Sequence, residues 1–89
     1  MATFLVETYL PRAAAGEPDA TIRRAIAAAT ASAASGEAVA YLRSIFIPED
    51  ETCMLLFEAD GEDVVRVIAM SAGIDPDRVS RADDRPARG

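Results

Sequence analysis

The chain contains no histidine and no lysine, and its single cysteine is Cys53. Without histidine, a Ser-His-Asp or Cys-His nucleophilic site is excluded, as are the histidine-based spacings that usually hold zinc, copper or nickel. One cysteine cannot form an internal disulfide, and no CxxC pair marks a soft-metal loop. The missing residue types therefore argue against the common hydrolases and against a transition-metal site.

Long apolar runs and basic stretches are also missing. No apolar run approaches the roughly 20 residues that a helix needs to cross a bilayer, and the amino terminus lacks the basic segment of a signal peptide. The net charge is −6 and the nine basic residues are scattered arginines, so most of the surface would repel a phosphate backbone. No glycine-rich phosphate loop is present. We therefore expect a cytoplasmic protein that binds neither nucleic acid nor membranes.

The 89 residues have the composition of one small folded domain, with 51% hydrophobic and 27% charged residues. A domain of this size buries only about 60–65% of the surface that its unfolded chain exposes, which leaves a thin margin of stability. Association of two copies would relieve that weakness. We expect the domain to span residues 1–82, followed by a tail at residues 83–89 that is loose unless a partner holds it.

Hydrophobic periodicity and breaker residues predict six elements in the order β-α-β-β-α-β. These are strands at Thr3–Leu10 and Pro76–Ala82, a helix at Asp19–Ser35, a hairpin at Ala38–Asp60 with its turn at Pro48–Glu51, and a helix from Asp60 to Gly73, while Arg12–Glu17 is a loop. Asp60 is expected to be the N-cap of the second helix. The helices should bury two stripes, one of Ile22, Ile26, Ala29 and Ala33 and the other of Val65, Ile68, Ala69 and Ala72. The order predicts an α+β, ferredoxin-like fold of the dimeric α+β barrel type, with an antiparallel four-stranded sheet in spatial order 4-1-3-2 and both helices on one face.

Alternation along the strands separates two faces of this sheet. With the predicted turn, the hairpin pairs run from Ile47/Thr52 back to Leu42/Phe57 and Tyr41/Glu58. The helix-covered face is then expected to hold Phe4, Val6, Thr8, Leu42, Ser44, Phe46, Cys53, Leu55 and Phe57. The other face, called here the open face, is expected to hold Leu5, Glu7, Tyr9, Tyr41, Arg43, Ile45, Ile47, Thr52, Met54, Leu56 and Glu58. It is too apolar for a water-facing surface, so we predict a homodimer formed through it.

Two curved sheets packed in this way would enclose a pocket for a small organic molecule. The predicted ligand-binding residues are Leu5, Glu7, Tyr9, Tyr41, Arg43, Ile45, Met54, Leu56 and Glu58. One alternative is an enzyme acting on an apolar metabolite, and the similarity of the expected fold to dimeric α+β barrel enzymes implies a cofactor-free isomerase, cyclase or oxygenase by fold analogy alone. In it, a dry pocket would make Glu7 a general base, with Tyr9 or Tyr41 as acid or hydrogen-bond donor. Glu7 could instead form an ion pair with Arg43, which could also turn to Glu58. A flat interaction module without a cavity is a further alternative.

Four segments resemble one known family: FLVETYLP at Phe4–Pro11, YLRSIFIPEDETC at Tyr41–Cys53, LFEA at Leu56–Ala59 and AGIDPDRV at Ala72–Val79. The family consists of small, mostly uncharacterised bacterial proteins of ferredoxin-like fold, abundant in actinobacteria, and its best-known branch is nickel-binding. The resemblance implies the fold and dimers formed through the sheet. That branch is rich in histidine on and near its first two strands, whereas this chain offers Glu7, Tyr9 and the cation Arg43. Nickel therefore remains only an alternative, and we expect no cofactor and no metal site.

Overall fold

The computed structural model describes residues 1–11 and 16–85. Its elements are β1 (Ala2–Tyr9), α1 (Glu17–Ala34), β2 (Val39–Ile47), a short 3-10 turn (Pro48–Asp50), β3 (Thr52–Ala59), α2 (Glu62–Ser71) and β4 (Arg78–Ala82). Part of the predicted loop, residues 12–15, and the end of the predicted tail, residues 86–89, lie outside the described residues. The order and type of all six predicted elements are confirmed.

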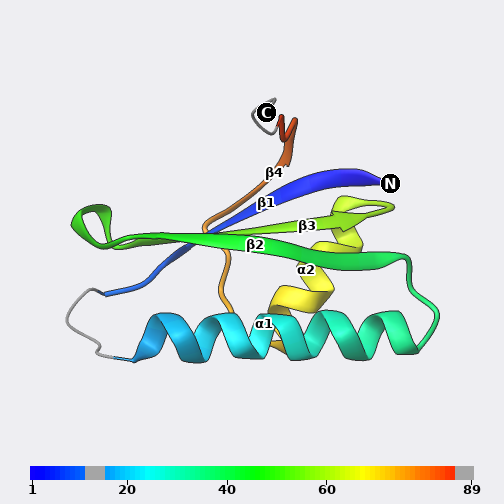
Figure 1. Cartoon of the computed structure of the whole chain (residues 1–89), viewed down its shortest axis with the longest axis horizontal. Helices are drawn as coiled ribbons and strands as arrows, with labels where there is room; N and C mark the ends of the chain where they lie inside the picture. Colours follow the sequence, from blue (N-terminus) through cyan, green and yellow to red (C-terminus); the bar gives the residue numbers. More distant parts are fainter. Residues whose placement is uncertain (12–15, 86–89) are drawn as a thin grey trace.

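The four strands form one sheet in the order β2-β3-β1-β4, which is the predicted order read from the other edge. All three neighbouring pairs are antiparallel. Both helices lie on one side of the sheet, and the segment after β4 lies on the other side (Figure 1). The ferredoxin-like architecture is therefore confirmed, and among the described residues no helix covers the open face.

The core lies between the sheet and the two helices. The largest fully buried side chains include Phe57 and Leu55 of β3, Val6 of β1 and Val65 of α2. The predicted stripe of α2 is confirmed, because Val65, Ile68, Ala69 and Ala72 are all buried. Burying a side chain of the size of valine, leucine or phenylalanine stabilises the fold by about 1.5–3 kcal/mol, so these residues hold α2 against the sheet.

The buried stripe of α1 differs from the predicted one. Thr21, Ala25 and Ala29 are buried, while Ile26 is 41% exposed and Ala33 also faces solvent. Small side chains at Ala25 and Ala29 let α1 approach the sheet closely. The free energy gained from this close packing exceeds what burial of Ile26 would add. The prediction from spacing alone was wrong for Ile26 and Ala33.

The ends of α2 correct one prediction and confirm another. Gly61, in an extended conformation, is the N-cap of α2 and makes no side-chain cap bond, so Asp60 is not the cap as predicted. At the other end Gly73 has φ +71°, and Ile74 N–H donates to the Ala69 carbonyl at 2.8 Å. This left-handed glycine ends the helix as the sequence predicts and turns Ile74 into the core.

A β-bulge in β2 changes which residues reach each face. The register follows the prediction from Ile47 to Arg43, then shifts, so that Tyr41 pairs with Phe57 and Ala40 with Glu58. The extra residue of the bulge is Leu42, which is 37% exposed. The predicted pairs of Leu42 and Tyr41 are therefore wrong. The ring of Tyr41 stands edge-on to Phe57 on the helix-covered face, with centroids 5.8 Å apart.

Candidate functional site: the open face of the sheet

The strand register arranges the open face in rows that cross all four strands. One row consists of Arg78, Glu7, Met54 and Ile45, and the next of Ser80, Leu5, Leu56 and Arg43. Four apolar members of these rows, Leu5, Ile45, Met54 and Leu56, are called here the apolar floor. Glu7 and Arg78 border the floor on the β1–β4 side, and Arg43 borders it on the β2 side. The face thus combines an apolar centre with charged groups at two edges.

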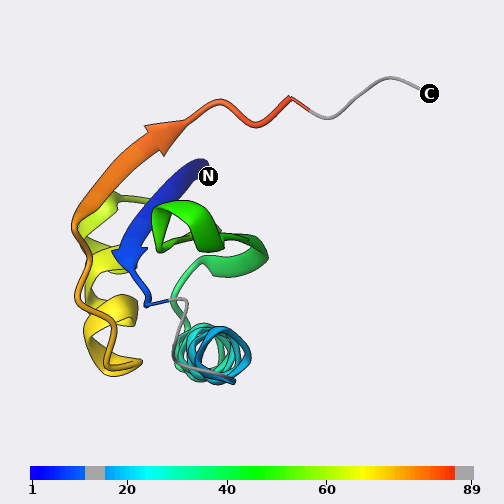
Figure 2. The same cartoon turned by 90° about the vertical axis from the view of Figure 1, so that its left-hand side faces the viewer.

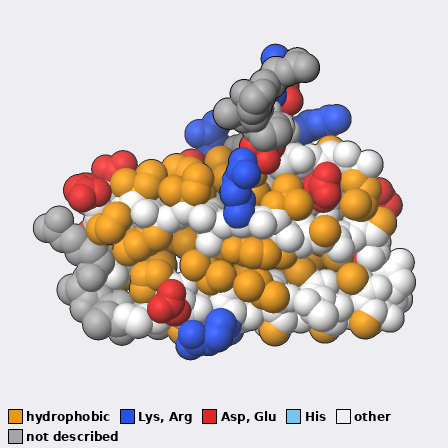
Figure 3. All heavy atoms as spheres, in the orientation of Figure 1, with side chains coloured by type: hydrophobic (Ala, Val, Ile, Leu, Met, Phe, Trp, Pro, Cys, Tyr) orange, Lys and Arg blue, Asp and Glu red, His pale blue; other side chains and the backbone are white. Residues whose placement is uncertain are grey.

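Exposure varies strongly across the apolar floor. Leu56 on the central strand β3 is 7% exposed, whereas Ile45 on the edge strand β2 is 48% exposed. Leu5 and Met54 are partly buried. Figure 3 views the sheet from its β2 edge, where hydrophobic side chains gather along the strand and charged side chains lie where the C-terminal segment meets the sheet. An antiparallel sheet face that stayed in water would carry mainly polar side chains, so this surface is suited to being covered.

Arg43 makes an ion pair that the sequence did not predict. Its Nη2 donates to Asp84 Oδ1 at 2.5 Å, and no bond joins Arg43 to Glu7 or Glu58 among the described residues. Asp84 belongs to the segment after β4, called here the strap and consisting of Asp83, Asp84 and Arg85. The strap leaves the sheet on the side opposite the helices (Figure 2). The predicted pair of Glu7 and Arg43 is therefore not formed.

The width of the sheet indicates how Arg43 reaches the strap. β2 and β4 are the two edge strands, so about 14 Å separates them at the usual strand spacing. Asp84 follows the end of β4 by two residues, which span at most about 7 Å. Arg43 must therefore lean inward across its neighbour Leu56 to meet the carboxylate. An arginine that leans inward in this way can lay its aliphatic stem over the apolar floor.

Glu7 has a different neighbour from the one that the sequence suggested. It pairs directly across the strands with Arg78, whose Nε donates to Ser80 Oγ at 3.1 Å. Among the described residues, no hydrogen bond or ion pair joins the Glu7 carboxylate to another side chain. One signal in the sequence could have identified Arg78: because Val79 is the inward anchor of β4, the residues beside it must point outward.

The three predicted catalytic residues do not share one face. Glu7 and Tyr9 both lie on the open face of β1, and Tyr9 is 59% exposed at its end. The Tyr41 hydroxyl donates to Ser44 Oγ at 3.0 Å, on the helix-covered side. Placing Tyr41 in the open-face pocket was therefore wrong, and the bulge at Leu42 is the physical reason.

The remaining predicted open-face residues keep their places. Glu58 pairs with Thr3 and Ala40 in the row beyond Leu56, and Ile47 pairs with Thr52 beside Tyr9. Cys53 is buried on the helix-covered face as predicted, and burial raises the pKa of its thiol. Among residues 1–11 and 16–85, no three Cys, Asp or Glu side chains gather as a metal site would require.

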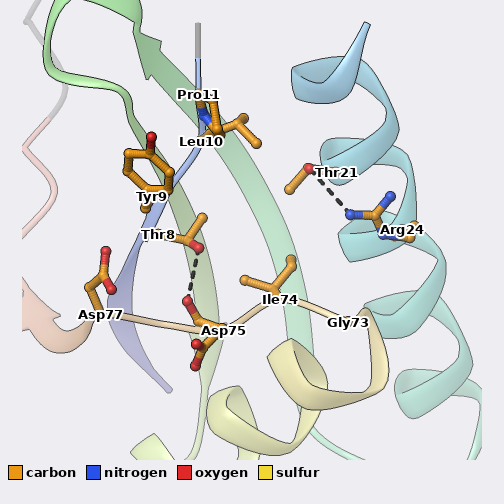
Figure 4. A pocket seen from close by; sticks show the side chains of 10 residues that line it. All are labelled: Thr8, Tyr9, Leu10, Pro11, Thr21, Arg24, Gly73, Ile74, Asp75 and Asp77. Atoms are coloured by element: carbon orange, nitrogen blue, oxygen red, sulfur yellow. Dashed lines mark hydrogen bonds between the residues drawn. The ribbon is translucent and has the colours of Figure 1, made fainter. Parts of the chain in front are cut away.

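A cavity of about 420 Å³ that the sequence did not predict lies at the end of β1. It is lined by Thr8, Tyr9, Leu10, Pro11, Thr21, Arg24, Gly73, Ile74, Asp75 and Asp77 (Figure 4). Thr8 Oγ1 donates to the Asp75 carbonyl at 2.9 Å, and Arg24 Nε donates to the Ala72 carbonyl at 2.9 Å. These bonds connect β1 and α1 to the α2–β4 segment. The residues along the inner wall of the cavity therefore stabilise the fold. Tyr9 borders both the cavity and the open face.

None of the described helices is long and apolar enough to span a bilayer. No family model and no curated protein matches the chain. Among solved structures, the crystal structure of SCO4226 from Streptomyces coelicolor A3(2) is similar, with a TM-score of 0.77 and 15% sequence identity, over 96% of this chain and all of that one. A likeness at this identity shows the fold, and its actinobacterial source agrees with the resemblance seen in the sequence. The chain therefore has a βαββαβ ferredoxin-like architecture with a counterpart in a small actinobacterial protein.

Proposed function

We propose that two copies of the chain associate through their open faces and that the space between the sheets binds a small organic molecule with an apolar body. The observation that carries this proposal is the apolar floor, bordered by Arg43 on one side and by Glu7 and Arg78 on the other. Ligand pockets typically combine an apolar lining with a few convergent polar groups. The open face supplies both.

The layer arrangement supports association through this face. A sheet must bury its apolar side against another layer, and here both helices are used on the opposite side. Ile45, half-exposed on the edge strand, would be covered by a second copy. In a two-fold dimer every contact occurs twice, so each apolar residue at the interface is removed from water in both copies.

The charged residues support an enclosed space rather than a flat dry contact. Arg43, Glu7, Arg78 and Glu58 all lie on the open face. Burying such groups without partners costs several kcal/mol each, as an order of magnitude. Water or a polar ligand between the sheets would satisfy them, and the natural twist of two facing sheets leaves room for it.

Binding is proposed here in preference to catalysis. The enzyme hypothesis needs a dry Glu7 with a tyrosine as proton donor nearby. Arg78 lies directly opposite Glu7, and Tyr41 is on the other side of the sheet. Only Tyr9 remains beside Glu7 as a potential donor, and it is 59% exposed.

Two methionines on opposite sides of the molecule provide the test. Met54 lies in the apolar floor, whereas Met70 is 74% exposed on α2. We expect the full chain to sediment as a dimer and to bind an apolar anilinonaphthalene dye. Met54→Glu should abolish both properties, because it places a charge in each half of the interface, and Met70→Glu should preserve both. A wild-type chain that remains a monomer at high concentration, or a dimer that only Met70→Glu disrupts, would refute the proposal.

A further inference from the structure

We infer that the molecule bound at the open face is an apolar carboxylic acid, and that the Asp84 carboxylate of the strap occupies the place of its acid group in the free chain. This inference rests on the proposed function and specifies the ligand class. It also makes the strap a competitor of the ligand. A ligand acid group that takes the same donor of Arg43 displaces Asp84.

The side chain of Arg43 indicates which class of ligand the open face would bind. Its guanidinium already binds a carboxylate, with Nη2 and Oδ1 2.5 Å apart. Arginine presents a planar fork of donors that matches a carboxylate, and it remains charged at any physiological pH. The bound carboxylate comes from a segment 41 residues away in sequence, so no local turn imposes this contact. Asp84 thus acts as an internal stand-in for an acid ligand.

The surroundings determine how such a ligand would lie. Leu56 and Leu5 follow Arg43 in the same row, and Met54 and Ile45 lie in the next one. A chain of several carbons could lie along Leu56 and Leu5 while its acid group pairs with Arg43. On the other side of the floor Glu7 lies opposite Arg78, so the two charges largely offset each other there and the acid group is attracted mainly to Arg43. A neutral head group could accept a hydrogen bond from Arg43 but would not gain the attraction between opposite charges.

The strap is held in a way that permits its release. The pair between Arg43 and Asp84 is the one side-chain bond from the strap to the sheet among the described residues, and the two side chains are 54% and 25% exposed. Asp83 instead pairs with Arg85 inside the strap, with the atoms 2.7 Å apart. Ion pairs this exposed contribute little to stability, so a ligand carboxylate can compete with Asp84.

Octanoate and octanamide are suitable probes, because they share the apolar chain and differ in the charge of the head group. Calorimetric titration of the full chain should show tighter binding of octanoate. Asp84→Asn should strengthen octanoate binding about two- to five-fold, which is the range expected from removing a weak exposed ion pair. Arg43→Gln should remove the preference for octanoate over octanamide. Asp83→Asn, the matched control in the same strap, should leave both affinities unchanged.

Other results would overturn the inference and separate it from the proposed function. Equal binding of the two probes to the wild type, or unchanged octanoate affinity in Asp84→Asn, would refute a carboxylate ligand while leaving an apolar site in place. A dimer that binds neither probe would refute the inference as well. A monomeric chain that binds neither probe would refute both the inference and the proposed function.

Discussion

Replacing Ile45 by alanine should weaken the proposed dimer by a predictable amount. Ile45 is 48% exposed in the single chain, so about half of its burial energy remains for association. Complete burial of an isoleucine side chain is worth about 1.5–3 kcal/mol, which leaves about 0.7–1.5 kcal/mol for each copy. Because the dimer contains two copies of Ile45, the free energy of association falls by about 1.5–3 kcal/mol in total. Ile45→Ala should therefore raise the dimer dissociation constant roughly ten- to a hundred-fold.

Val67→Ala is the matched control for this measurement. Val67 is 61% exposed on α2, so the variant removes a similar apolar group from the side of the molecule where the helices lie. Sedimentation equilibrium over a range of concentrations gives the dissociation constant of each variant. Urea denaturation of the same samples would show that both chains remain folded. An unchanged constant for Ile45→Ala, or a larger change for Val67→Ala, would refute association through the open face.

Three further predictions concern the helix-covered side. Tyr41→Phe should lower the free energy of unfolding by about 0.5–1.5 kcal/mol without changing the dimer dissociation constant, whereas Tyr9→Phe should leave stability unchanged. Thr8→Val should cost a similar amount in urea denaturation, because it removes the bond to the Asp75 carbonyl. Burial raises the pKa of the Cys53 thiol, so its stabilising contribution is complete below the ordinary thiol pKa and is lost as pH rises through the raised value. Wild type should therefore lose more stability at alkaline pH than Cys53→Ala; equal losses would contradict this.

The architecture could be predicted because each element carries its own local signal. Alternating apolar residues define the strands, and Pro48 and Gly73 mark where elements end. The hairpin register near the turn was also correct, since a short turn fixes which residues face each other. With the order β-α-β-β-α-β, right-handed crossovers then leave few arrangements of the sheet. Topology therefore follows from local pattern and general rules of chain connection.

The bulge at Leu42 could not be predicted from alternation. Both Tyr41 and Leu42 are suitable for a strand, and a regular register would place Leu42 towards the helices. The structure instead turns Tyr41 inward, where its ring contacts Phe57 and its hydroxyl reaches Ser44. These contacts depend on how the strands and α1 fit together, which no short window of sequence records. One inserted residue was enough to move Tyr41 to the opposite face.

The partner of Arg43 was also beyond sequence reasoning. Glu7, Glu58 and Asp84 are all carboxylates that an arginine on the open face could approach, and sequence distance does not choose among them. The path of the chain after β4 decides the outcome, because it brings Asp84 over the face. Glu7 is left opposite Arg78, a residue on the strand with the weakest sequence signal. Long-range charge pairing thus depends on the finished fold.

The apolar end of one row, Ile45 and Met54, should behave differently from the row of Arg43 when a second copy covers the open face. Covering the pair of Arg43 and Asp84 in a dry interface would strip water from an exposed ion pair, and that cost can exceed the attraction between the charges. Ile45 and Met54 carry no such cost, because apolar groups gain from losing water. We therefore expect close packing at Ile45 and Met54 and an open, hydrated space beside Leu56 and Arg43. The same charge that makes tight contact unfavourable there is the one that would hold an acid ligand.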